Sequence, residues 1–281
     1  MLRYMTIFGM NFYSYDLVNS ISVLILLILW LGQYRNYKKL ATLPALWGNT
    51  LKKNKSVPFF RNETALTIYE MLLVLIVHLL ISLVMNRALA RLFKVGGANY
   101  FGTVLFGPIG VLLVCLRSKV NPLKVMDILT PPIAFALCIS KIACALDGCC
   151  YGYQCDSFYY NNWMLEYEFP VQLVEAGCAL VFFFVLTLMK KFVRRDGIIF
   201  PSYLIMYSVC RFFSEFARAD FPSVLGDLVS YQLQCIAGAV IGVAVLIIVL
   251  RYGERISAFT DRSKARYTED FQKRYNRQIK H

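Results

Sequence analysis

Apolar residues along this chain gather in blocks of about 20 residues, the length that lets an α-helix cross the hydrocarbon core of a bilayer. Shorter polar stretches separate the blocks. The pattern predicts an all-α polytopic membrane protein with about seven transmembrane helices. The predicted spans cover residues 13–33, 66–89, 99–116, 125–145, 170–189, 198–215 and 231–250.

Lysine and arginine are concentrated in alternate connections, after the first, third and fifth spans and again after the seventh. In contrast, residues 146–169 contain neither lysine nor arginine, although the connection after the second span is less clear. Cytoplasmic loops are enriched in these residues. We therefore predict an extracytoplasmic N-terminus, a cytoplasmic C-terminus, a transmembrane domain over residues 1–250 and a basic cytoplasmic tail over residues 251–281. Two states of the tail stay open, a surface helix on the inner leaflet and a solvated disordered segment.

Composition excludes an ordinary soluble protein. The chain is 58% hydrophobic and 17% charged, whereas soluble domains average roughly 45–50% and about 25%. The net charge of +13 would also suit a nucleic-acid-binding protein. Because the basic residues flank apolar blocks or lie in the tail, we attribute the charge to the membrane surface and expect no nucleic-acid partner.

Span six ends in a polar stripe. Arg211, Glu215 and Arg218 are spaced at i, i+4 and i+7, which places them on one helix face. Charged residues cost about 2.5–3.5 kcal/mol each at membrane depth, so they usually face the bundle interior and mark a substrate path. Two guanidiniums can bind a phosphate while the carboxylate orients one of them. Snorkelling to the interface with a structural ion pair is the alternative, above all for Arg218.

Spans four and five place further polar residues at the same membrane depth. Lys141 lies about one turn inside the end of span four, as a second phosphate ligand or as a snorkelling lysine. Gln172 and Glu175 open span five, where Glu175 can pair with a cation or act as a base. Gly148 and Gly152 predict a helix stop followed by a tight turn.

Four of the nine cysteines, Cys144, Cys149, Cys150 and Cys155, lie close together in the sequence on the predicted outer side. An oxidising exterior permits a disulfide from Cys149 or Cys150 to Cys155. We predict no metal site and no cofactor, because the two histidines, at positions 78 and 281, are elsewhere in the chain.

Residues 97–220 resemble the prolipoprotein diacylglyceryl transferase family of bacterial membrane enzymes. The resemblance rests on short segments whose order, spacing and membrane side agree with the family. They are Phe106-Gly107-Pro108-Ile109-Gly110, Asp127 with Pro131 and Pro132, the stretch from Lys141 to Gly152, Pro170 with Gln172 and Glu175, and Arg211-Phe212, Glu215-Phe216 and Arg218-Ala219-Asp220.

The resemblance implies transfer of a diacylglyceryl group from phosphatidylglycerol to the lipobox cysteine in the signal segment of a prolipoprotein. It implies a multi-pass protein of the bacterial cytoplasmic membrane with an extracytoplasmic active face. Arg211 would bind the phosphoglycerol headgroup, Glu215 would orient it and Lys141 would complete the catalytic set. Gly152 would shape the loop over the site, and the implied substrate-binding residues also include Asp147, Gln172, Glu175 and Arg218.

The chain departs from the family pattern inside the signature. Lys141 replaces an arginine, Cys144 replaces an asparagine, and Cys149 ends the triplet that reads Asn-Gly-Glu in the family. The family histidine is missing, with Leu105 or Phe106 in its place. This divergent Gly-Cys-Cys-Tyr-Gly version leaves two alternatives open. One is a paralogue of the same fold acting on another lipid or acceptor, and the other is a non-enzymatic membrane thiol or transport protein.

Overall fold

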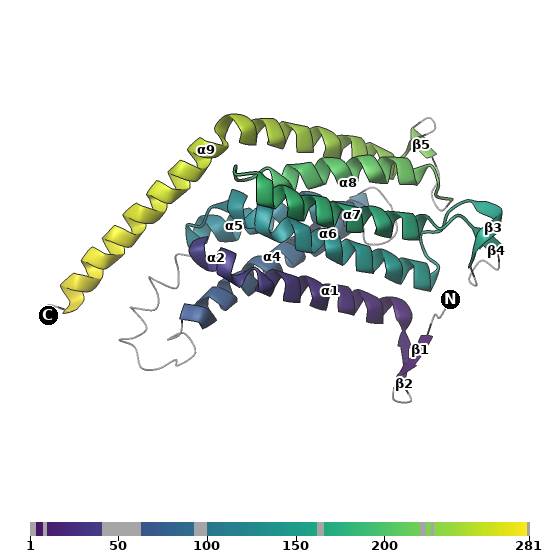
Figure 1. Cartoon of the computed structure of the whole chain (residues 1–281), viewed down its shortest axis with the longest axis horizontal. Helices are drawn as coiled ribbons and strands as arrows, with labels where there is room; N and C mark the ends of the chain where they lie inside the picture. The colour runs from purple at the N-terminus through teal and green to yellow at the C-terminus, as the bar shows by residue number, and fades with distance from the viewer. Residues whose placement is uncertain are drawn as a thin grey trace. The chain divides into compact units, whose positions relative to one another are not determined.

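The computed structural model of the chain describes residues 4–7, 10–40, 63–92, 100–161, 166–219, 223–225 and 228–279. Helices make up most of these ranges (Figure 1). They are α1 (Ser14–Gly32), α2 (Tyr34–Leu40), α4 (Glu63–Leu92), α5 (Tyr100–Ser118), α6 (Pro122–Asp147), α7 (Val171–Phe192), α8 (Ile199–Glu215) and α9 (Ser230–Ile279).

The strands form two-stranded antiparallel sheets, each from neighbours in the sequence. Their bounds are β1 (Tyr4–Ile7) with β2 (Met10–Tyr13), β3 (Gln154–Asn161) with β4 (Glu166–Glu168), and β5 (Ser223–Leu225) with β6 (Leu228–Val229). These short hairpins were not predicted. The first hairpin precedes α1 and the other two lie at helix connections, so they leave the all-α class unchanged.

Five helices in the described part of the chain are long and apolar enough to cross a membrane. Their apolar segments are Tyr15–Gly32, Thr64–Ala88, Pro122–Asp147, Val171–Phe192 and Tyr231–Ser263, and Gly102–Ser118 is a shorter apolar helix. The prediction of an all-α polytopic membrane protein is therefore confirmed. The 17-residue helix α8 coincides with the predicted span over residues 198–215. The total of about seven spans and the sides of the two termini stay predictions.

The chain divides into two compact units. One contains the described residues of Met1–Leu29, Leu129–Val193 and Ile199–Val245, and the other those of Trp30–Ile128, Arg194–Ile198 and Leu246–His281. The candidate site residues of spans four to six, from Lys141 to Arg218, all belong to the first unit, which therefore carries the candidate site.

In the second unit, small residues of α5 let it pack closely on α4, as is common between membrane helices. A Cβ atom at Gly107 would lie 2.1 Å from Cε1 of His78, and one at Gly110 would lie 2.8 Å from the carbonyl oxygen of Val77. His78, a lone histidine within a span, thus packs on the glycine-rich segment of α5. Asp127 also has a local role in this unit, since its Oδ2 accepts a 2.6 Å hydrogen bond from the backbone N–H of Gly197.

In the first unit, polar and aromatic contacts join α1, α6, α7 and α8. The Ser22 hydroxyl of α1 donates a 2.6 Å hydrogen bond to the carbonyl oxygen of Ala136 in α6. Aromatic pairs connect α6 to α7 through Phe135 and Phe183, and α7 to α8 through Phe182 and Tyr203. These contacts hold the ends of α6 and α8 beside the start of α7, where the candidate polar residues lie.

The basic tail is helical over its described residues, because α9 continues from Ser230 to Ile279, well past the predicted end of the span at residue 250. Glu269 and Lys273 form an exposed i, i+4 ion pair of 2.9 Å that supports the helix. The described tail residues are therefore helical, and a position of this helix on the inner leaflet stays a prediction.

Close packing of α4 on α5 predicts that Gly110→Ala destabilises the protein, because the added methyl group meets backbone rather than a movable side chain. Overpacking costs about 1–3 kcal/mol. The matched control is Gly177→Ala in α7, where a Cβ meets nothing within 4 Å. Thermal unfolding of the purified protein in detergent should show a lower midpoint for Gly110→Ala alone, and equal midpoints would contradict the packing.

Candidate functional site in the first unit

A buried carboxylate joins the three central helices of the first unit. Glu175 of α7 forms ion pairs with the ammonium of Lys141 in α6 and with the guanidinium of Arg211 in α8. The exposed fractions of these three residues are only 6–8%. An isolated buried charge is very costly, whereas a paired and hydrogen-bonded one is tolerated. The network therefore requires α6, α7 and α8 to meet at this depth.

A second carboxylate extends the network along α8. Glu215 Oε2 lies 2.8 Å from a guanidinium nitrogen of Arg211 and 3.9 Å from Nε of Arg218. The predicted polar stripe is thus present. The Arg218 side chain is only 3% exposed, so Arg218 does not snorkel to the interface. Three cations and two carboxylates in this five-residue ion cluster leave one net positive charge.

Two neighbours of the ion cluster, Ser214 and Tyr231, were not predicted as site residues. The Ser214 hydroxyl donates a 2.6 Å hydrogen bond to Glu175 Oε1, and the Arg211 guanidinium lies 5.7 Å from the ring centroid of Tyr231. Ser214 follows Arg211 by three residues on the same helix face, so helical spacing could have identified it. Tyr231 of α9 is distant in sequence, and only the packed structure brings it here.

The loop after α6 passes between the start of α7 and the end of α8. Gly152 forms an antiparallel bridge with Arg218, and the N–H of Tyr153 donates a 3.0 Å hydrogen bond to the carbonyl oxygen of Ala217. A Cβ atom at Gly152 would lie 2.3 Å from the carbonyl oxygen of Phe169. Only glycine allows this close approach of three backbone segments. The predicted role of Gly152 in shaping the loop has a direct steric basis.

Gln172 of α7 holds this loop against α7 through hydrogen bonds. Its side-chain amide donates hydrogen bonds of 2.9 Å to the carbonyl oxygen of Cys149 and 3.2 Å to Glu168 Oε1. Gln172 is fully buried. It thereby positions the signature loop instead of joining the ion cluster. Asp147, the last residue of α6, is partly exposed and belongs to none of the ion pairs found among the described residues.

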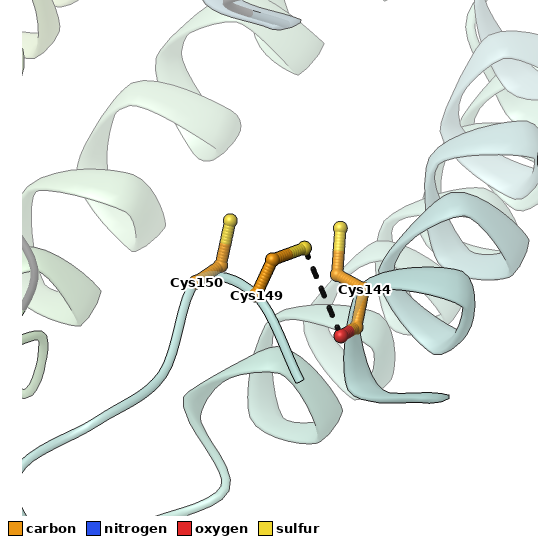
Figure 2. Close-up of side chains that lie close together, drawn as sticks. All are labelled: Cys144, Cys149 and Cys150. Atoms are coloured by element: carbon orange, nitrogen blue, oxygen red, sulfur yellow. Dashed lines mark hydrogen bonds between the residues drawn. The ribbon is translucent and has the colours of Figure 1, made fainter. Parts of the chain in front are cut away.

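Three thiols converge beside the ion cluster. The Sγ atoms of Cys144, Cys149 and Cys150 all lie within 4.8 Å of one another, and Figure 2 shows the Cys149 sulfur beside that of Cys144. Cys155 of β3 is not among the cysteines grouped in this thiol cluster, and its Sγ donates a hydrogen bond to the carbonyl oxygen of Ser157. All these cysteines are free thiols. The disulfide predicted from Cys149 or Cys150 to Cys155 is not formed in the structure, and Cys144 is the actual neighbour.

The loop thiol of Cys150 lies in a position that favours its ionised form. Hydrogen bonds with the thiols of Cys144 and Cys149 lower the pKa of Cys150, and the nearby cations Arg218 and Lys141 act in the same direction against the effect of burial. A thiolate is both the nucleophilic and the metal-binding form of cysteine.

An apolar cavity of about 650 Å³ lies between α7 and α8, within the usual size range of small-molecule sites. Its wall is formed by Phe169, Val171, Val174, Cys178, Phe182, Ile205, Met206, Val209, Cys210, Phe213, Ser214 and Ala217. Ser214 also donates to Glu175, so one residue links the apolar wall to the ion cluster. The site thus combines a positively charged polar centre with a hydrophobic neighbour.

The family profile described as prolipoprotein diacylglyceryl transferase matches residues 5–248. The chain belongs to the prolipoprotein diacylglyceryl transferase family. The match extends well beyond residues 97–220, so the first, second and seventh predicted spans also lie within the family region.

Curated relatives carry the corresponding enzyme name. Phosphatidylglycerol–prolipoprotein diacylglyceryl transferase 2 of Clostridium perfringens is 32% identical over 149 residues, which are 48% of this chain and 56% of the relative. The transferase of Clostridium tetani is 28% identical over 159 residues, 53% of this chain and 63% of the relative. That of Staphylococcus saprophyticus is 27% identical over 165 residues, 54% of this chain and 59% of the relative. The aligned chain therefore spans little more than half the length of these relatives.

The signature positions at which this family member departs from the pattern are concentrated in the thiol cluster. Cys144 and Cys149 stand where the resemblance expects asparagine and glutamate, and both lie against Cys150. The lysine that replaces the signature arginine, Lys141, is in contrast fully integrated into the ion cluster. Asp220, the last residue of the matching motif, lies outside the described residues.

Burial of the Glu175 ion pairs predicts that Glu175→Gln is strongly destabilising, because it leaves two buried cations without their shared carboxylate. Breaking a buried pair costs about 3–5 kcal/mol. The control is Glu254→Gln. Glu254 lies 3.6 Å from Arg195 in a surface ion pair, and its side chain is 82% exposed. Exposed pairs contribute about 0–1 kcal/mol. Denaturant unfolding in mixed micelles checks the difference, and similar losses for both variants would refute the structural importance of Glu175.

Proposed function

We propose that this chain is an integral membrane transferase that moves a diacylglyceryl group from phosphatidylglycerol to the lipobox cysteine of a prolipoprotein. The observation that carries the proposal is the buried, net positive ion cluster linked through Ser214 to an apolar cavity. Membership of the family and the enzyme names of the relatives support the same reaction.

The ion cluster suits the phosphate of the lipid headgroup. A phosphodiester carries one negative charge, which balances the one net positive charge of the five-residue cluster. Arg211 is the best placed ligand, because Glu175 and Glu215 hold its guanidinium from two sides. A guanidinium fixed in this way can offer two parallel N–H donors to phosphate oxygens. Arg218 and Lys141 add positive charge nearby.

The same cations would assist the reaction. The acceptor sulfur attacks the glyceryl carbon, the bond from that carbon to the phosphate oxygen breaks, and glycerol phosphate leaves with the bonding electrons. Negative charge therefore grows on the leaving phosphate, and preorganised cations stabilise it in the transition state. The thiol proton must pass to a base. Glu175 is occupied by two ion pairs and a hydrogen bond, which favours its role as an ion-pair partner over that of a base.

The apolar cavity between α7 and α8 suits the acyl chains of the donor lipid. Apart from the Ser214 hydroxyl, two thiols and the Met206 thioether, its lining side chains are hydrocarbon or aromatic. Lipid tails are as apolar as these side chains, so the acyl chains can pack against this wall while the headgroup reaches the ion cluster. Glycerol phosphate has no acyl chains to pack here and can leave.

We place the active face on the extracytoplasmic side of the bacterial cytoplasmic membrane, with the N-terminus outside and the C-terminus inside. The loop that carries Gly152 belongs to residues 146–169, which contain no lysine or arginine, while the C-terminal helix is strongly basic. The positive-inside rule favours this orientation. A prolipoprotein signal segment crossing the membrane would meet the site on that side.

A paralogous activity on another lipid or acceptor is the second candidate. Cys144 and Cys149 replace an asparagine and a glutamate of the family signature, and the family histidine is absent from α5. These changes lie outside the five-residue ion cluster. Mass analysis of the lipids in a deletion strain, or of products formed from mixed lipids, separates this activity from the main proposal.

The direct test is thioether formation on a lipobox peptide by the purified protein in phosphatidylglycerol-containing vesicles. Arg211→Ala should lower the rate by about 10²–10³-fold, the usual loss for one preorganised donor to a developing charge. Arg195→Ala is the control, because Arg195 forms only an exposed ion pair. Lack of product from the wild type, where another family member works, or full activity of Arg211→Ala, would defeat the proposal. Activity that depends on Cys149 and Cys150 but not on Arg211 would instead favour a thiol protein.

A further inference from the structure

The thiol cluster of Cys144, Cys149 and Cys150 is built from two neighbouring elements. Cys144 lies in the last turn of α6, and the other two follow in the loop. Their sulfur atoms lie within 4.8 Å of one another, and Figure 2 shows the Cys149 sulfur between the other two in that view. A cluster of three thiols exceeds what a disulfide needs, since a disulfide leaves the third sulfur unused.

The backbone of the loop is held in a conformation that makes this convergence possible. Gly148 has a φ of +86° and Cys150 a φ of +60°. The left-handed region costs an ordinary residue about 1–2 kcal/mol, and such conformations persist where the surroundings enforce them, often at functional sites. Here the Gln172 amide holds the carbonyl group of Cys149, and the bridge from Gly152 to Arg218 fixes the next residues.

Cations of the ion cluster lie near this loop. Lys141 precedes Cys144 by three residues on α6, and the charges of Lys141 and Arg218 act on Cys150. Three thiolates held together repel one another, so nearby cations and a bound metal ion would stabilise them in the same way. Thiolate sulfur is a soft ligand that selects Zn(II) and Cu(I) over Mg(II) or Ca(II).

We propose that Cys144, Cys149 and Cys150 form a three-thiolate binding site for a soft metal ion, Zn(II) or Cu(I). With metal–sulfur bonds of about 2.3 Å, three sulfurs around one ion lie roughly 3.8–4.0 Å apart. The observed separations of at most 4.8 Å require only a small contraction. A disulfide would require two sulfurs to close to about 2.05 Å. Binding releases the remaining thiol protons to solvent, and no oxidant is needed.

We predicted no metal site from the sequence because both histidines lie elsewhere in the chain. Thiolates alone, however, can bind a soft metal ion. The expected partner of Cys149 and Cys150 was Cys155, which lies away from the thiol cluster on β3. The actual third ligand candidate is Cys144, five residues before Cys149, because α6 ends at Asp147 and Gly148 adopts a left-handed φ of +86°. Metal binding at this site does not rest on the transferase activity, and it is measured without it.

The test uses the full chain, purified in detergent, reduced and then freed of reductant. Equilibrium dialysis with Zn(II), and competition with a Cu(I) chelator, should each give one ion per chain, and Cd(II) should give a thiolate charge-transfer band in the ultraviolet. Cys144→Ser, Cys149→Ser and Cys150→Ser should each weaken binding at least tenfold. Cys155→Ser should bind like the wild type. Preference for Zn(II) or for Cu(I) follows from the two affinities. No uptake by the reduced wild type, or unchanged uptake by the triple variant, would overturn the site.

A second measurement needs no variant and so does not depend on folding of the substituted chains. The wild type is alkylated with and without Zn(II), and the labelled peptides are identified by mass spectrometry. Zn(II) should protect Cys144, Cys149 and Cys150, while labelling of Cys155 stays the same. Equal labelling of all four, or a disulfide within the cluster that forms in place of metal uptake, would contradict the proposal.

Discussion

The carboxylate of Glu175, buried between the ammonium of Lys141 and the guanidinium of Arg211, is the interaction on which the site depends. Each partner comes from a different helix, so the charges can be paired only when α6, α7 and α8 meet. Transfer of a lone charge into a low-dielectric interior costs many kcal/mol. The same three residues therefore set the helix arrangement and form the centre of the anion site that we propose.

The groups beside the ion cluster indicate which kind of ligand suits it. One net positive charge lies beside an apolar cavity, which is the arrangement that an anionic phospholipid requires. On the loop side, Gly152 and Gln172 hold the signature segment against α7 and α8 and so bring the thiol cluster next to the cations. Lipid chemistry and metal binding would then share Lys141 and Arg218, although each is tested separately.

Helical periodicity was sufficient to predict part of the site. The fold class and the stripe of Arg211, Glu215 and Arg218 follow from apolar block length and from i, i+4 and i+7 spacing. Periodicity within one helix does not predict which residues of other helices lie opposite. The contact of Tyr231 with Arg211 and the hydrogen bond from Gln172 to Cys149 therefore required the structure. The thiol cluster depends on the left-handed backbone at Gly148 and Cys150. The helix stop at Gly148 was predicted from the glycine, whereas the positive φ of Cys150 has no clear signature in the sequence.

The proposed function requires Arg211, held by two carboxylates, to bind the phosphate of a bound lipid. Solid-state NMR of the protein with ¹⁵N-labelled arginine in phosphatidylglycerol bilayers measures this contact through phosphorus–nitrogen dipolar dephasing. We expect a dephased guanidinium signal from a buried arginine that disappears in Arg211→Lys and persists in Arg195→Lys. Phosphorus dephasing that is unchanged when Arg211 is replaced would contradict it, because the lipid headgroup would then lie elsewhere.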